Sequence, residues 1–130
     1  MTPALPDILI GQTVALSAPS PPEAAGDYMV GKLGLLAMLA ALAAQEAERG
    51  VAVRVAENQA IAEVLNAAGD AVTTPDHDLA WRALDAANAA LRRRLIDVHE
   101  AAEQRGDGAL QRRILELYVA MAADRALSLG

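Results

Sequence analysis

Few residues in this 130-residue chain have the types and spacing that chemistry requires. The two histidines are His77 and His99, and neither has neighbours in the sequence that would mark it as a catalytic base. Because the chain has no cysteine, it has no thiolate for nucleophilic catalysis or for metal binding. We therefore predict no catalytic residue, and we favour a protein that is not an enzyme.

A metal site between helices would need carboxylates and histidines at a set spacing. Carboxylate-bridged metal pairs use Glu-x-x-His on each of two helices, together with two further glutamates. Ile96 stands three residues before His99, so this sequence is absent. His99 and Glu103 lie one helical turn apart and can contact each other at the surface. We predict no metal and no cofactor.

Residues 26–33 come close to the sequence of a phosphate-binding loop. That loop needs Ser or Thr after its lysine, because the hydroxyl binds magnesium, and here Leu33 follows Lys32. The loop also follows a buried strand, whereas residues 20–23, Ser-Pro-Pro-Glu, have the composition of a helix start. We interpret the segment as helix.

Five residues remain as candidates for a pocket or an interface. Trp81 is the chain's one tryptophan and a candidate anchor in a core or an interface. Arg92 and Arg93 belong to a run of three arginines, whose side chains point about 100° apart on a helix and so do not form one patch. His99 and Tyr118 complete the set.

The composition predicts helices. The chain has 31 alanines and 18 leucines, no phenylalanine, and a hydrophobic fraction of 54%, which is enough for a core. Alanine and leucine favour helices, while the aromatic residues that favour strands are nearly absent. We predict an all-α fold with an arm or short fifth helix at 1–19 and one helical-bundle domain at 20–130.

Prolines and glycines predict the helix boundaries. Gly50 would end a helix in the left-handed conformation, Gly69 and Gly106 would each end a further helix, and Asp107 would cap the last one. We expect an antiparallel four-helix bundle with helices at approximately 21–49, 54–68, 75–105 and 108–128. Leucines cover most of the circumference of the first helix, which should therefore be central and buried.

The first residues allow two interpretations. Ile8, Ile10, Val14 and Leu16 alternate with other residues as in a strand, yet Pro6 could open a helix from 6 to 18. We favour the helix, because a lone strand would have no partner in this chain.

The net charge of −6 argues against a nucleic-acid partner, which would need a positive surface. The first residues lack the basic segment of a secretory signal. The longest apolar stretch, 29–44, contains Lys32 and is shorter than the roughly 18–20 residues that span a bilayer. We predict a cytoplasmic protein with no membrane or nucleic-acid partner.

The predicted second helix is half as long as the longest ones, which would leave apolar surface uncovered at one end. We expect a homodimer that buries this surface together with the 8–18 arm. The predicted function is that of a non-enzymatic accessory or protein-interaction protein. The alternative is a small-molecule binder or an enzyme with a pocket between helices.

Residues 31–39, 46–50 and 110–129 resemble, in spacing and in alanine–leucine content, a family of small all-helical bacterial domains without an assigned function. These domains are often encoded beside acyl-CoA dehydrogenases and aminoglycoside-phosphotransferase-like proteins. The family's C-terminal Asn-Pro is absent here, since the chain ends Leu129-Gly130. The resemblance implies an accessory role near acyl-thioester metabolism and no catalytic residue.

Overall fold

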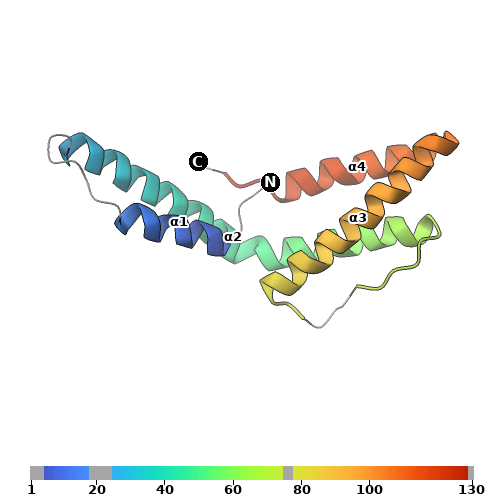
Figure 1. Ribbon diagram of the computed structural model, residues 1–130, viewed down its shortest axis with the longest axis horizontal. Coiled ribbons are helices and arrows are strands. Elements are labelled where there is room, and N and C mark those ends of the chain that lie inside the picture. Colours follow the sequence, from blue (N-terminus) through green and yellow to red (C-terminus); the bar gives the residue numbers. More distant parts are fainter. Residues whose placement is uncertain (1–4, 18–24, 75–77, 129–130) are drawn as a thin grey trace. The chain divides into compact units, whose positions relative to one another are not determined.

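The computed structural model describes residues 5–17, 25–74 and 78–128, and in these ranges it contains helices and no strand (Figure 1). The all-α prediction is confirmed for this part of the chain. The helices are α1 (Leu5–Ser17), α2 (Ala25–Ala67), α3 (Trp81–Arg105) and α4 (Gly108–Asp124). The helical interpretation of the first residues is therefore correct and the strand interpretation is wrong. The predicted helix start at Ser20 lies outside the described residues.

The largest correction concerns Gly50, which does not end a helix. α2 continues through this residue for 43 residues in all, so the predicted helices at 21–49 and 54–68 are one element. A glycine inside a helix costs only about 1 kcal/mol relative to alanine. Gly50 is buried in the structure, and among the described glycines only Gly69 and Gly106 have a positive φ.

The third helix begins at Trp81 rather than at residue 75. Ala80 before it is extended, with φ −63° and ψ 135°, and the Asp78 carboxylate accepts a hydrogen bond of 3.0 Å from its N–H. The prediction took Thr74-Pro75-Asp76 as the start. Thr74 is not helical, and positions 75–77 lie outside the described residues.

The predicted turn between α3 and α4 is confirmed. Gly106 adopts the left-handed conformation with φ 69°, and the N–H of Asp107 reaches back to the carbonyl of Ala102 at 2.9 Å. The Asp107 carboxylate then accepts a hydrogen bond from the N–H of Leu110 at 3.1 Å, which caps α4. Gly69, with φ 88°, ends α2 in the same way.

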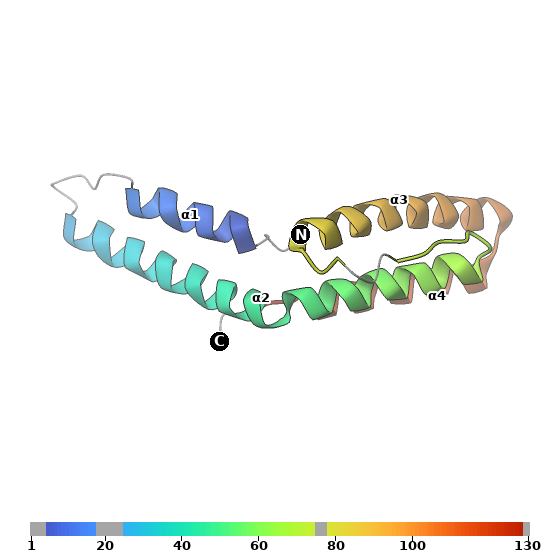
Figure 2. The same ribbon diagram turned by 90° about the horizontal axis from the view of Figure 1, so that it is seen from below.

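The chain divides into two compact units. The N-terminal unit comprises residues 1–50 and 126–130, and the bundle unit comprises residues 51–125. In the N-terminal unit α1 lies along the first part of α2 (Figure 2), where Gln12 Nε2 donates to the Leu36 carbonyl at 3.3 Å. Ile8 of α1 is only 3% exposed.

The first part of α2 is not the buried central helix that we expected. Leu33 is 58% exposed, Leu35 44% and Met38 37%. A helix that is apolar around its whole circumference needs neighbours on every side. In this unit α1 covers one side, so much of the apolar surface stays exposed.

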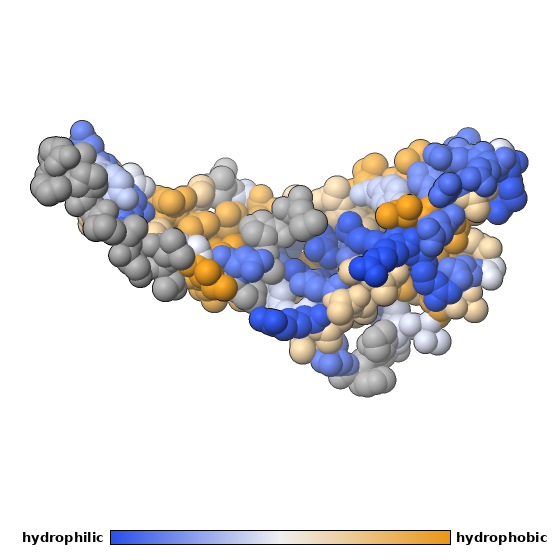
Figure 3. Space-filling view, in the orientation of Figure 1, coloured by the Kyte–Doolittle hydropathy of each residue, from blue (hydrophilic) through white to orange (hydrophobic). Residues whose placement is uncertain are grey.

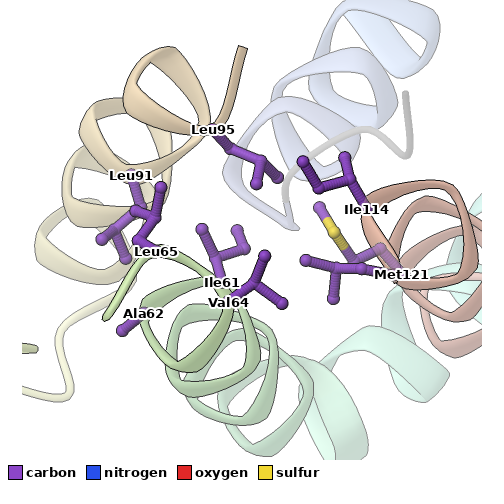
Figure 4. Packing of buried hydrophobic residues seen from close by; sticks show 9 residues of the cluster. Ile61, Ala62, Val64, Leu65, Leu91, Leu95, Ile114 and Met121 are labelled. Atoms are coloured by element: carbon purple, nitrogen blue, oxygen red, sulfur yellow. The ribbon is translucent and has the colours of Figure 1, made fainter. Parts of the chain in front are cut away.

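The bundle unit contains one hydrophobic core, to which all three of its helical segments contribute (Figure 4). The core residues are Ile61, Ala62, Val64 and Leu65 of α2, Leu91 and Leu95 of α3, and Ile114, Leu117 and Met121 of α4.

The last part of α2 and α3 run in the same direction, contrary to the antiparallel order that we expected. Arg54 pairs with Asp85, and further along both helices Glu57 pairs with Asn88. The chain between Gly69 and Trp81 could extend over roughly 36 Å, longer than the roughly 25 Å of helix that it must pass. α3 and α4 are antiparallel, with Gln111 Nε2 donating to the Ala102 carbonyl at 3.2 Å.

α2 also meets the length and composition criteria for a membrane span. An 18-residue stretch within its residues 26–67 has a mean hydropathy of 1.5. One such helix is weak support for a span, because core helices and signal sequences meet the same criteria.

Replacing Gly106 by alanine should destabilise the bundle unit by about 1–2 kcal/mol, the cost of a left-handed conformation for a residue with a Cβ. The control is Gly108→Ala, two residues later at the start of α4, where a Cβ meets no atom within 4 Å and φ is not positive. This second variant should be neutral or more stable. Urea unfolding followed by circular dichroism measures both, and equal destabilisation would contradict the turn described here.

Candidate functional site

The most concentrated set of polar contacts in the described residues surrounds Glu57, near the middle of α2. Its side chain is only 2% exposed. Oε1 accepts hydrogen bonds from Asn88 Nδ2 at 2.7 Å and from Arg92 Nη2 at 2.7 Å, and Oε2 accepts one from Arg125 Nε at 2.5 Å. The carboxylate therefore joins α2, α3 and the residue that follows α4.

Two asparagines extend this network. Asn88 Nδ2 also donates to Asn58 Oδ1 at 2.8 Å, and Asn58 Nδ2 donates to the Leu84 carbonyl at 3.2 Å. Asn58 is 4% exposed and Asn88 7%. Since a buried amide without partners would be costly, these bonds specify how α2 and α3 are aligned. We call Glu57, Asn58, Asn88, Arg92 and Arg125 the Glu57 network.

A second ion pair lies one turn earlier on α2. The side chain of Arg54 is 3% exposed, and its Nε lies 2.6 Å from Asp85 Oδ1. The guanidinium carbon lies 4.0 Å from the centroid of the Trp81 ring, within the range of a cation–π contact. Trp81, at the start of α3, therefore contacts α2 through the Arg54 side chain.

Burial raises the pKa of Glu57, but hydrogen bonds from Arg125, Arg92 and Asn88 lower it by more, so its pKa lies below the ordinary value of 4.5. The carboxylate is thus ionised at neutral pH and already has its acceptor positions occupied. A general base needs a pKa near the working pH and access to substrate. The geometry instead suits a structural ion pair.

The side chains of the three consecutive arginines have different surroundings, as their spacing predicts. Arg92 binds Glu57, whereas Arg94 binds Asp70 in the linker after α2 through both carboxylate oxygens. This contact lowers the pKa of Asp70. Arg93 is exposed. The run is therefore not a single basic patch.

His99 and Tyr118 do come together. Their ring centroids are 5.9 Å apart, and His99 Nε2 lies 3.6 Å from Glu103 Oε1, as the one-turn spacing predicts. Burial raises the pKa of the Tyr118 phenol, and the positive charge of Arg92 partly opposes this effect. Arg92, His99 and Tyr118 thus share one region of the α3–α4 hairpin, while Trp81 and Arg93 lie apart from it.

A small pocket lies beside Asn58 and has a volume of about 80 Å³. Its walls are mainly apolar, and none of the five candidate residues contributes to them. The lining residues are Val55, Asn58, Gln59, Thr74, Asp78, Leu79, Ala83, Leu84 and Ala87. Two wider and more open hollows, of about 410 Å³ and 350 Å³, are lined in part by Val72 and Thr73 of the linker after α2. No group of three or more metal-binding side chains occurs in the described part of the chain.

The sequence indicated Arg92 as a candidate residue, but its partner Glu57 was not predicted. A signal was available, since Arg54, Glu57, Asn58, Ile61 and Leu65 step by three and four along one face of α2. Asn88 likewise interrupts the apolar stripe of α3 between Leu84 and Leu91. Polar residues within an apolar stripe indicate buried hydrogen-bonded pairs.

Comparison with family models, with curated proteins and with solved structures found no match for this chain. The resemblance to the small bacterial helical domains therefore stays a prediction.

Glu57→Ala should destabilise the bundle unit by about 3–5 kcal/mol, because it leaves the charges of Arg92 and Arg125 without their carboxylate. The matched control is Glu63→Ala on the exposed side of the same helix, which should change the free energy of unfolding little. Urea unfolding measures both, and a loss no larger than that of the control would contradict the network.

Glu57 should also contribute to acid sensitivity. Because its pKa is lower in the folded than in the unfolded protein, its stabilisation is fully present above about pH 4.5 and is lost as pH falls through the folded value. The difference in free energy of unfolding between wild type and Glu57→Gln should be constant near neutrality and shrink below that pH. A difference that does not change with pH would contradict the lowered pKa.

Proposed function

We propose that this chain is a non-enzymatic accessory protein that binds another protein chain through the apolar surface of its N-terminal unit. The observation that carries this proposal is the exposure of large apolar side chains there, which ranges from 37% to 72%. They are Leu9 and Ile10 of α1 and Tyr28, Met29, Val30, Leu33, Leu35 and Met38 of α2. Apolar surface is visible along this part of α2 in Figure 3.

This surface is large enough for its burial to drive association with another protein chain. The exposed fractions of the eight side chains add up to about four fully exposed ones. Burying them would contribute on the order of 6–12 kcal/mol, at about 1.5–3 kcal/mol for each side chain. Met29, Val30 and Leu33 lie on one face of α2, and an exposed apolar patch of this kind marks an interaction site in folded proteins.

The bundle unit supports the non-enzymatic part of the proposal. Its buried ionisable groups, Glu57 and Arg54, are held by ion pairs and hydrogen bonds within the unit. Such contacts fix the alignment of the helices. They also occupy hydrogen-bonding positions of both groups. We take this unit to be a scaffold in a cytoplasmic bacterial protein, as the composition and the resemblance predict.

The alternative is a small-molecule binder or an enzyme with an inter-helix pocket, possibly linked to acyl-thioesters. It has less support, because Trp81, His99 and Tyr118 line neither the pocket beside Asn58 nor the two hollows beside Val72. The net charge of −6 likewise favours a protein partner over a nucleic acid.

Affinity capture from the source cell tests the proposal. Tagged wild-type protein should retain one or more protein chains, untagged copies of itself included, and the triple variant Met29→Ser/Val30→Ser/Leu33→Ser should lose them. The matched control replaces three exposed apolar residues of the bundle unit, Ile96, Leu115 and Val119, by serine. Mass spectrometry quantifies the retained chains.

The control variant should retain the same chains as the wild type. If no retained chain depends on the α2 residues, the apolar surface of the N-terminal unit is not an interaction site and the proposal is wrong.

A further inference from the structure

One face of α2 in the N-terminal unit is exposed over about five turns and carries no charged side chain. We call this face the α2 stripe. Its residues recur at intervals of three and four and are all exposed: Gly26, Met29, Val30, Leu33, Gly34, Ala37, Ala40, Ala41 and Ala44. The solvent side of a helix normally carries polar residues. This one has the composition of a contact face, although α1 lies on the other side of the helix, where Gln12 binds the Leu36 carbonyl.

Side-chain size changes along the α2 stripe from one end to the other. The large residues, Met29, Val30 and Leu33, lie in its first half, and only alanines follow from Ala37 to Ala44. A helix that packs here with the opposite direction and the same sequence would place its large residues against these alanines. The stripe is therefore complementary to a reversed copy of itself.

We propose that the α2 stripe binds the α2 stripe of a second copy of this chain, antiparallel and with a two-fold axis at Ala37. This inference rests on the proposed function and names its partner. In that register Val30 lies opposite Ala44 of the other copy, and Leu33 lies opposite Ala41. The contact is isologous, so each of these pairs occurs twice.

The small residues let the two helices approach closely. A Cβ built on Gly26 or Gly34 would meet no atom within 4 Å, so the space in front of these positions is open. Alanine and glycine at a helix contact bring the axes toward the short end of the roughly 8–10 Å range. Two copies then combine two α1 helices and the first parts of two α2 helices in one assembly.

The antiparallel direction keeps the two Glu48 carboxylates apart. Glu48 is exposed on the same face, one turn beyond Ala44. In the proposed register its carboxylate reaches the first turn of α2 in the other copy, where the positive helix dipole attracts it and Asp27 repels it. A parallel dimer would instead bring the two Glu48 carboxylates together and stack Leu33 against Leu33.

A lipid surface suits the α2 stripe less well. Helices that lie on membranes carry lysine and arginine beside their apolar face. Here the flanking charges include Asp27 and Glu48, with Lys32 as the one basic residue between them. Alanine also gains little by transfer into lipid, whereas it gains from close packing against a second helix.

Ala37→Glu tests the contact, because it places two carboxylates against each other at the two-fold axis. Wild-type protein should sediment at micromolar concentration with twice the 13.5 kDa mass of the chain. The variant should raise the dimer dissociation constant by about 100-fold or more, the effect of burying unpaired charge. The control, Ala109→Glu at an exposed position of α4, should stay dimeric. Circular dichroism should show the same helix content in all three proteins.

Single cysteines test the register, since the chain has no cysteine of its own. A mixture of Val30→Cys and Ala44→Cys proteins, treated with a short bismaleimide, should give more cross-linked dimer than either protein alone. Cross-linking of Val30→Cys mainly to itself would indicate a parallel dimer and would overturn the proposal.

Two further outcomes would overturn this inference. Each also shows whether the failure extends to the proposed function. The first is a wild-type protein that stays monomeric at high micromolar concentration but still captures another protein through Met29, Val30 and Leu33. The second is a monomer that co-sediments with phosphatidylcholine–phosphatidylglycerol vesicles and loses this binding in Ala37→Glu, which would assign the α2 stripe to a membrane.

Discussion

The bundle unit depends on one buried carboxylate. Glu57 lies in a core of alanine, leucine and isoleucine, where an unpaired charge would cost several kcal/mol. It therefore requires donors from each neighbouring segment, and Asn88, Arg92 and Arg125 supply them. Because these donors come from α3 and from the end of α4, the carboxylate fixes the alignment of both helices against α2.

This constraint specifies an alignment that apolar packing alone leaves open. The core of the unit consists mainly of leucine, isoleucine, valine and methionine side chains, whose hydrophobic contacts have no preferred direction. The parallel course of α2 and α3 is specified instead by polar pairs at matching positions, Arg54 with Asp85 and Glu57 with Asn88. Trp81, stacked on Arg54, adds an aromatic contact between the start of α3 and α2.

The N-terminal unit has the opposite character. Its first part of α2 is apolar on all sides and has α1 as its neighbour, so burial within the chain cannot be complete. The sequence suggested a central helix because the pattern of leucines predicts how much of a helix surface avoids water. That pattern does not reveal whether the covering surface belongs to the same chain. The expectation of burial and the proposal of a second copy thus rest on the same residues.

By itself the sequence determined the features that depend on neighbours along the chain. These are the helical content, the ends of helices at Gly69 and Gly106, the cap at Asp107 and the apolar faces of the bundle unit, since local propensity and hydrogen bonding decide them. Tertiary structure alone decided that α2 continues through Gly50 and that α2 and α3 run in parallel. It also decided that Glu57 meets Arg92 and Arg125, because these outcomes depend on contacts between residues far apart in the chain, which no local pattern encodes.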